Sequence, residues 1–299
     1  MTWKSALGLV AYFLFFLVCA YAMIWWQRRQ RKMRKPFGDD LRLLRGPGET
    51  QLTLSRQMEE NSLYWLLVAA SVPVGLFCVM LGFTRSLPEV IQLGWVAVSV
   101  VAFISTYIAA ARWFAAKSRE GFDRYLGYFG ERIVAEHLDP LKARGWRIFH
   151  DVPGLNNGTK FNLDHVGVGP TGVFVVETKT RRKGAARPGF EDHKAYFDGR
   201  RLVWPWGEDN HGLEQAERNA LWLADTLKTE IGEPVYVTPF LALPGWWVEN
   251  KPSRDSRICR VVNPKALPTL LAKGATVLST DQINAIAAKL EFRCRDVTY

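Results

Sequence analysis

The chain has 299 residues, of which 48% are hydrophobic, and a formal net charge of +10 at pH 7. This length predicts about two domains. Residues 1–119 hold 14 Lys/Arg against 6 Asp/Glu, whereas residues 120–299 hold 25 against 23. The near-neutral second part excludes a uniformly basic nucleic-acid-binding domain, so any nucleic-acid contact there must come from local patches.

Three uncharged apolar runs lie in the first part of the chain: Ser5–Gln27, Asn61–Thr84 and Val90–Ala111. Each exceeds the ~20 residues that cross a bilayer. A signal peptide is the alternative for the first run, but its apolar core is too long and the positive cluster follows it rather than preceding it. We therefore predict three transmembrane helices, at about residues 5–27, 61–84 and 90–111.

Basic residues flank these runs. Six cations lie within residues 28–35, and Arg112, Lys117 and Arg119 follow the third run. Such clusters mark the cytoplasmic side of a span and attract anionic membrane lipid; a DNA-binding arm is the alternative for the first cluster. The pattern predicts an integral protein of a bacterial-type inner membrane, with an external N-terminus, a basic cytoplasmic loop at 28–60 and a cytoplasmic C-terminal region.

The four cysteines show no CxxC or Cys/His spacing, which excludes the usual zinc motifs and a disulfide framework. No acidic or basic residue lies deep in an apolar run. This argues against a transporter or channel, because ion and proton pathways need such groups.

A β-hairpin is predicted for residues 163–179, LDHVGVGPTGVFVVETK. Its two apolar runs, Val166–Val168 and Val173–Val176, flank a cluster of turn-forming residues. If Pro170 and Thr171 form the centre of the turn, paired residues have numbers that sum to 341.

This register places Asp164 opposite Glu177, and strand alternation places Lys179 on the face of Glu177. Like charges that lie opposite each other destabilise a sheet. A divalent cation would offset the repulsion, because hard cations such as Mg²⁺ take carboxylate oxygens. A surface ion pair between Lys179 and one carboxylate is the other interpretation.

Other patterns predict the rest of the region. Arg181, Arg182, Lys183 and Arg187 follow the hairpin and form either a phosphate-binding patch or a solvated loop. Trp246 and Trp247 are expected to pack in the core rather than to stack on bases. The remaining expectations are a helix at 122–138, a strand at 146–151, a loop at 154–160, a hairpin around Asp198-Gly199, a helix at 210–229, strands at 235–243 and 258–262, and a last helix that a Ser279–Gln282 capping box begins.

Four segments, in this order, resemble the nuclease-related domain (NERD) family of the PD-(D/E)xK nuclease superfamily. They are Gly130-Glu131-Arg132 at the start of a helix, the hairpin with VGPTGVFVVETK, Gln215 in a later helix, and TPFLALPGWWV from Thr238 to Val248. Asp164 followed by Glu177-Thr178-Lys179 corresponds to the D…(D/E)xK core. The resemblance covers roughly residues 122–248.

The resemblance implies an α/β fold with a restriction-endonuclease-like mixed sheet flanked by helices, and metal-dependent hydrolysis of phosphodiester bonds. Asp164 and Glu177 would bind Mg²⁺ or Mn²⁺, and Glu131 would add a ligand or hold a metal-bound water. Lys179 would stabilise developing charge, and Gln215 would orient the lysine or a phosphate. The implied partners are nucleic acid, DNA rather than RNA, and a second copy of the chain in a homodimer.

We expect a membrane anchor at residues 1–119, a nuclease-like domain at 120–250, and a C-terminal strand-and-helix extension at 251–299 that packs on it. Two functions remain open: a membrane-anchored nuclease, or a catalytically silent module that tethers nucleic acid or proteins to the membrane. The near-neutral charge favours the tether. The convergent carboxylates favour the nuclease, because a scaffold has no physical need for them.

Overall fold

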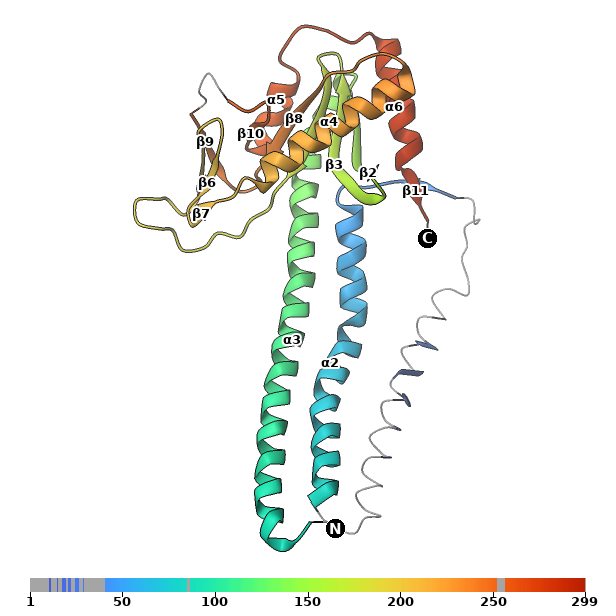
Figure 1. Ribbon diagram of the computed structural model, residues 1–299. Coiled ribbons are helices and arrows are strands. Elements are labelled where there is room, and N and C mark those ends of the chain that lie inside the picture. The colour runs from blue at the N-terminus through green and yellow to red at the C-terminus, as the bar shows by residue number, and fades with distance from the viewer. Residues whose placement is uncertain are drawn as a thin grey trace. The chain divides into compact units, whose positions relative to one another are not determined.

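The computed structural model describes residues 41–84, 87–251 and 256–298, with scattered positions between 11 and 29 (Figure 1). The chain divides into two compact units, Met1–Gly38 with Thr53–Asp123, and Asp39–Leu52 with Arg124–Tyr299. Most of the expected first span at 5–27 and of the basic run at 28–35 lies outside the described residues.

Two long helices, α2 (Glu49–Thr84) and α3 (Glu89–Leu138), supply most of the described part of the first unit. The helical run Ile91–Arg144 is long and apolar enough to cross a membrane, and only 6% of its most apolar window is buried. The helical pieces Glu49–Ser62 and Tyr64–Met80 are bent relative to each other, and they provide a second crossing only if both belong to one span. Within the described residues, therefore, one helix could cross a membrane, or two if the bent pair counts as one span, and most of the first of the three predicted spans lies outside these residues.

The helix α3 is also longer than expected. We predicted a break between the third apolar run and a separate helix at 122–138, but α3 is continuous. The intervening residues, RWFAAKSRE, contain several good helix formers and no proline. The helix ends before Asp139-Pro140 and continues as the 3₁₀ helix η1 (Asp139–Arg144).

A five-stranded mixed sheet in the order β10-β8-β4-β3-β2 forms the centre of the second unit. The pairs β2–β3 and β3–β4 are antiparallel, whereas β4–β8 and β8–β10 are parallel. This arrangement confirms a mixed α/β fold. The strands are β2 (Arg147–Asn156), β3 (Thr159–Gly169), β4 (Gly172–Thr178), β8 (Val237–Ala242) and β10 (Arg260–Val262).

The central hairpin has the predicted register. Gly169 pairs with Gly172 and His165 pairs with Val176, so the residue numbers sum to 341. Gly172 has φ +125°, a conformation that a residue with a Cβ rarely adopts. The two-residue turn therefore lies where the sequence placed it.

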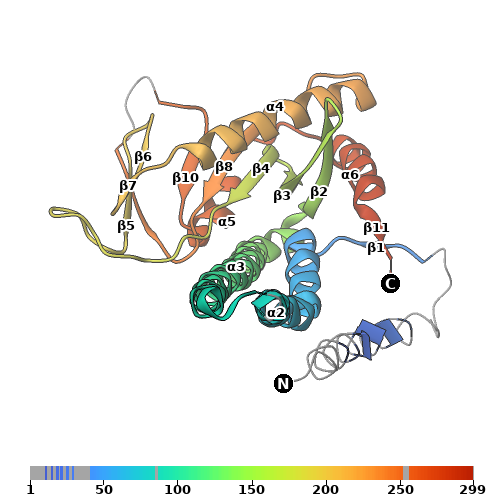
Figure 2. The ribbon, with the colours of Figure 1, turned by 60° about the horizontal axis from the view of Figure 1, so that its bottom comes forward.

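Helices cover both faces of this sheet (Figure 2). The helices α4 (His211–Ile231) and α6 (Thr280–Cys294) pack on one face through an aliphatic core. The C-terminal part of α3, η1 and α5 (Leu267–Leu271) pack on the other face. The predicted capping box is confirmed, because Ser279 and Gln282 exchange their side-chain and backbone hydrogen bonds at the start of α6.

The expected loop at 154–160 is instead the tip of a second hairpin. Strand β2 runs to Asn156 and β3 begins at Thr159, joined by Asn157 at φ +47° and Gly158 at φ +79°. Asn-Gly is the favoured sequence for a two-residue hairpin turn. The flanking strands therefore stay paired through a segment that its composition marked as irregular.

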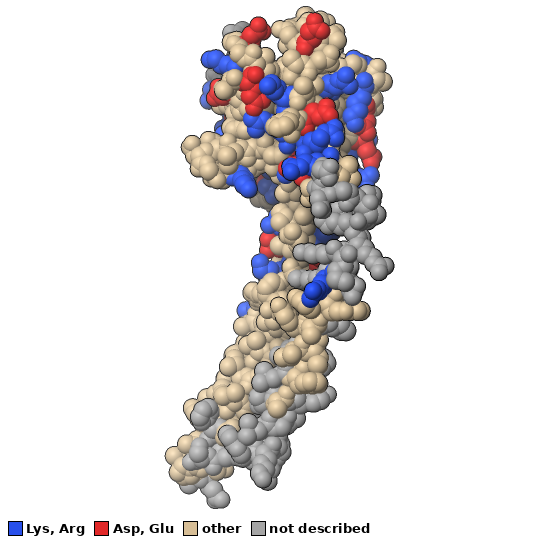
Figure 3. All heavy atoms as spheres, turned by 90° about the vertical axis from the view of Figure 1, so that its right-hand side faces the viewer, with Lys and Arg blue, Asp and Glu red and all other residues tan. Residues whose placement is uncertain are grey.

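A smaller sheet, in the order β7-β6-β5-β9, packs against the start of α4. Its strands are β5 (Lys194–Phe197), β6 (Leu202–Trp204), β7 (Gly207–Glu208) and β9 (Trp247–Asn250), and β1 (Leu43–Leu44) separately pairs with β11 (Arg295–Val297). Trp246 is buried in this core as predicted, but Trp247 is 64% exposed. On the face in Figure 3, acidic and basic side chains are interspersed over the second unit.

Gly130 allows α3 to approach the segment that follows β4. A Cβ on Gly130 would lie 1.8 Å from Oγ1 of Thr180, whereas a Cβ on Gly127 would meet nothing closer than 3.9 Å. We expect Gly130→Ala to lower the free energy of unfolding by about 1–3 kcal/mol through overpacking. The matched Gly127→Ala should raise it by up to about 1 kcal/mol, because alanine favours helix. Chemical denaturation of both variants measures the difference, and equal stabilities would contradict this packing.

Candidate functional site

A polar cluster lies at the end of β4, where Glu177 is 1% exposed. Nζ of Lys179 lies 2.7 Å from Oε1 of Glu177 and 2.9 Å from Oε1 of Gln215. The side-chain amide of Asn219 donates to Oε2 of Glu177 at 3.1 Å. Both oxygens of this buried carboxylate therefore have a donor, and Lys179 is held between two acceptors.

The helix α4 supplies the neutral members of the cluster. Gln215 and Asn219 are four residues apart and so lie on one face of the helix. A Cβ on Gly212, one turn earlier, would lie 3.0 Å from Cγ of Lys179. Glycine at this position thus makes room for the lysine stem. Our interpretation of the sequence missed Asn219, although an asparagine one turn after Gln215 was a signal for it.

Asp164 continues the hairpin beyond its last backbone pair. Its Oδ2 accepts the backbone N–H of Thr178 at 2.6 Å, so the carboxylate takes the place of a strand carbonyl. Burial raises the pKa of Asp164 well above its usual range, and repulsion from Glu177 and Glu131 raises it further. Lys179 acts in the opposite direction. Three carboxylates, those of Asp164, Glu177 and Glu131, therefore lie close to the single positive charge of Lys179.

Glu131 reaches this group from α3 and is 6% exposed. Among the described residues, its Oε2 has no hydrogen-bond partner. Burial raises the pKa of Glu131 to about 8, and the charges of Asp151 and Glu177 contribute to this increase. An unpartnered buried carboxylate oxygen is costly, so this atom is one that a cation or a donor would stabilise.

Strand β3, which carries Asp164, and its partner β2 are both distorted beside this residue. Phe149 and Val152 enter the same core, as do Leu163 and Val166 on β3, although each pair is three residues apart. Regular alternation puts residues three apart on opposite faces. Asp151, with φ +48°, lies at the point where the alternation slips.

The basic residues after Lys179 have partners within the protein. Arg181 forms an ion pair with Asp209 at 2.6 Å, and Lys183 lies over the ring of Trp246. Arg187 donates to the Pro205 carbonyl at 3.3 Å and lies over Phe190. Arg182 also interacts within the protein. These cations therefore anchor the segment that leaves the site, besides giving it positive charge.

The segment that forms the cluster can be compared with known families. Residues 126–244 match the family model of the nuclease-related domain (NERD). The matched NERD segment is less than half of the chain. It contains Asn219 and all five of the predicted site residues, Glu131, Asp164, Glu177, Lys179 and Gln215. Comparisons with curated proteins and with solved structures gave no significant match.

The carboxylates of Asp164, Glu177 and Glu131 are the side chains of the NERD segment that could bind a metal ion. In the part of the chain that the structure describes, no group of three or more His, Cys, Asp or Glu side chains is placed so that it could hold a metal ion by itself. Mg²⁺, however, usually keeps several waters and binds one or two carboxylates together with substrate phosphate. Asp164 and Glu177 offer such oxygens, and Oε2 of Glu131 is unpartnered. The donor set fits a hard cation that water or phosphate helps to bind.

Proposed function

We propose that this protein is a membrane-anchored, metal-dependent nuclease that hydrolyses phosphodiester bonds. The observation that supports it best is Lys179, whose Nζ lies 2.7 Å from Glu177 and 2.9 Å from Gln215 beside Asp164 and Glu131. Paired carboxylates, a metal ion and an adjacent lysine together provide what phosphodiester hydrolysis needs, because charge must be neutralised as the nucleophile attacks.

In this proposal Asp164 and Glu177 hold Mg²⁺ or Mn²⁺, with Glu131 as a further ligand or as the acceptor of a bound water. The ion would supply charge neutralisation and a water of lowered pKa. Lys179 donates from Nζ to a phosphate oxygen, and Gln215 keeps that ammonium in place. Asn219 fixes the carboxylate plane of Glu177.

The proposed nuclease function extends to a substrate, a membrane location and an assembly. DNA, rather than RNA, would pass along the segment with Arg181, Arg182, Lys183 and Arg187, which leaves the site directly. The anchor would be the apolar helices, in contact with lipid of a bacterial-type inner membrane, with the N-terminus outside and the NERD segment in the cytoplasm. A homodimer is the proposed assembly.

A catalytically silent tether is the second candidate. The observation that favours it is that both oxygens of Glu177 already have protein donors. In that case Lys179 and Glu177 would form a structural ion pair, and the fold would bind nucleic acid or protein partners without cleaving them.

A metal titration of the full-length protein in detergent separates the two candidates. We expect calorimetry to detect Mn²⁺ binding by the wild type, and Asp164→Asn to abolish both binding and cleavage of DNA. The control is Asp192→Asn, whose carboxylate is 71% exposed. A short phosphorothioate oligonucleotide should be present in a parallel titration, because phosphate helps to complete Mg²⁺-type sites. If the wild type neither binds Mn²⁺ under either condition nor cleaves nucleic acid, the tether is the better account.

A further inference from the structure

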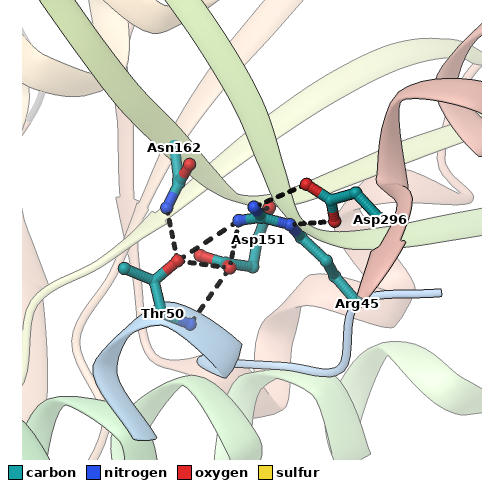
Figure 4. Close-up of polar contacts among 5 residues, drawn as sticks. All are labelled: Arg45, Thr50, Asp151, Asn162 and Asp296. Atoms are coloured by element: carbon teal, nitrogen blue, oxygen red, sulfur yellow. Dashed lines mark hydrogen bonds and ion pairs between the residues drawn. The ribbon is translucent and has the colours of Figure 1, made fainter. Parts of the chain in front are cut away.

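A second polar cluster joins the segment before α2 to strand β2 (Figure 4). Arg45 donates to both oxygens of Asp296, at 2.7 and 2.8 Å, and its third nitrogen, Nη1, lies 2.8 Å from Oδ2 of Asp151. Every nitrogen of the guanidinium is therefore engaged. Bidentate pairs of this kind fix geometry as well as charge.

Thr50, at the start of α2, completes the contacts of Asp151. Its backbone N–H and its hydroxyl donate to Oδ2 of Asp151 at 3.1 and 2.7 Å, and Asn162 donates to the same hydroxyl at 2.7 Å. The first N–H groups of a helix lack partners within it. Asp151 thus accepts from the N-terminus of α2 and from Arg45 together.

Asp151 needs these partners because of its conformation. It is 4% exposed and has φ +48° in the middle of a strand. Residues with a Cβ keep such a strained conformation only where contacts with the surrounding structure hold them in it. In the β2–β3 register, Asp151 lies between the pairs His150–His165 and Val152–Leu163, which places it across from Asp164.

The same segment reaches Glu131. The backbone N–H of Gly48 donates a hydrogen bond to this carboxylate. Gly48 has φ +67°, and a Cβ on it would lie 2.9 Å from the ring of Tyr128. Residues 45–50 therefore contact both Asp151, the left-handed residue across from Asp164, and the carboxylate of Glu131.

We propose that Arg45, Thr50 and Asp151 form a positioning clasp that gives Asp164 and Glu131 their working arrangement. This inference rests on the proposed function and deepens it. Two of the clasp residues, Arg45 and Thr50, lie outside residues 126–244, as does Asp296, which holds Arg45. The metal-binding unit therefore includes the segment before α2, and the NERD segment by itself lacks part of its site.

The test compares full-length variants in detergent by Mn²⁺ titration and by hydrogen exchange with mass spectrometry. Arg45→Ala removes the clasp cation, and Arg295→Ala is the control, because it removes an exposed ion pair between β11 and Glu291 of α6. Removal of a group that orients a metal ligand typically costs ~10- to 100-fold in affinity. We expect Arg45→Ala to weaken Mn²⁺ binding by about that factor and Arg295→Ala to leave it unchanged.

Two variants of Asp151 separate positioning from simple loss of stability. Asparagine tolerates the left-handed region and alanine does not. Asp151→Asn should therefore retain more Mn²⁺ affinity than Asp151→Ala at a temperature where both remain folded.

Hydrogen exchange gives a readout that does not depend on metal. We expect Arg45→Ala to speed exchange in peptides that contain Asp164 and Glu177 as well as in residues 45–52. Faster exchange in residues 45–52 alone, or wild-type metal affinity in Arg45→Ala, would overturn the clasp and leave the nuclease proposal standing. A wild type without metal binding or cleavage would remove the nuclease proposal, and the exchange pattern would still decide whether the clasp positions the carboxylates.

Discussion

Lys179→Met is expected to abolish cleavage, with a loss of at least 100-fold, and to lower the free energy of unfolding by about 3 kcal/mol. Removal of one donor that stabilises developing charge typically costs ~10²–10³ in rate. The stability loss arises because Glu177, 1% exposed, would keep its buried carboxylate without its cation, and breaking a buried pair from one side costs ~3–5 kcal/mol. The value lies at the low end because Lys179 is 23% exposed.

Lys194→Met is the matched control, since Lys194 has the same exposed fraction, 23%, but its partner Glu191 is 51% exposed. That substitution should cost less than about 1 kcal/mol. The double variant Glu177→Gln/Lys179→Met should recover much of the stability and none of the activity. Denaturant titration and a cleavage assay measure both quantities, and a Lys179→Met protein that cleaves at the wild-type rate would exclude a role for this ammonium in catalysis.

The second large effect concerns Glu131 and pH. In the folded protein the pKa of Glu131 is about 8, against 4.5 as the ordinary value. Between these two pH values the folded state holds a proton that the unfolded state has released, so the free energy of unfolding falls as pH rises. Above pH 8 the cost of the buried, charged Glu131 is fully present. One pKa unit corresponds to ~1.4 kcal/mol. The metal-free protein should therefore lose about 2 kcal/mol from Glu131 between pH 6.5 and 8, and Glu131→Gln should remove this loss.

The lower limit of that pH range avoids the buried histidines. Burial lowers the pKa of His150 to about 4 and that of His165 well below 6.5. Below pH 6.5 the unfolded state binds more protons at these histidines than the folded state does. Their contribution to the free energy of unfolding therefore rises with pH up to about 6.5 and is then constant. Glu136→Gln, an exposed change on the same helix, should keep the wild-type pH profile. Thermal unfolding with chelator at several pH values measures all three proteins, and parallel profiles for wild type and Glu131→Gln would contradict the raised pKa.

Local patterns were sufficient for the parts of the fold that depend on neighbouring residues. The hairpin register followed from a four-residue turn cluster, and the start of α6 followed from Ser279 and Gln282. These features involve contacts within a few positions of the chain. The contact between Lys179 and Glu177 could be predicted for the same reason, because Lys179 follows β4 directly and residues two positions apart in extended chain share a face.

The missed features depend on distant segments. Arg45 and Asp151 are 106 residues apart in sequence, and no periodicity connects them. The left-handed Asp151 is imposed by its partners and not by its neighbours in the chain. Gln215 reached the site prediction only through a family resemblance, and Asn219 did not reach it, because the helical stripe marks the core-facing residues and not the polar ones beside it.

The geometry of the site depends on the number of residues in the turn at Pro170 and Thr171. Side chains alternate with a period of two, so one additional residue in this turn would move every side chain of β4 to the opposite face. Glu177 would then leave α4, where Asn219 contacts it, and point toward the side of α3. Among related chains, homologues that keep the carboxylates but change the parity of this connection should be grouped with proteins that have lost the constellation.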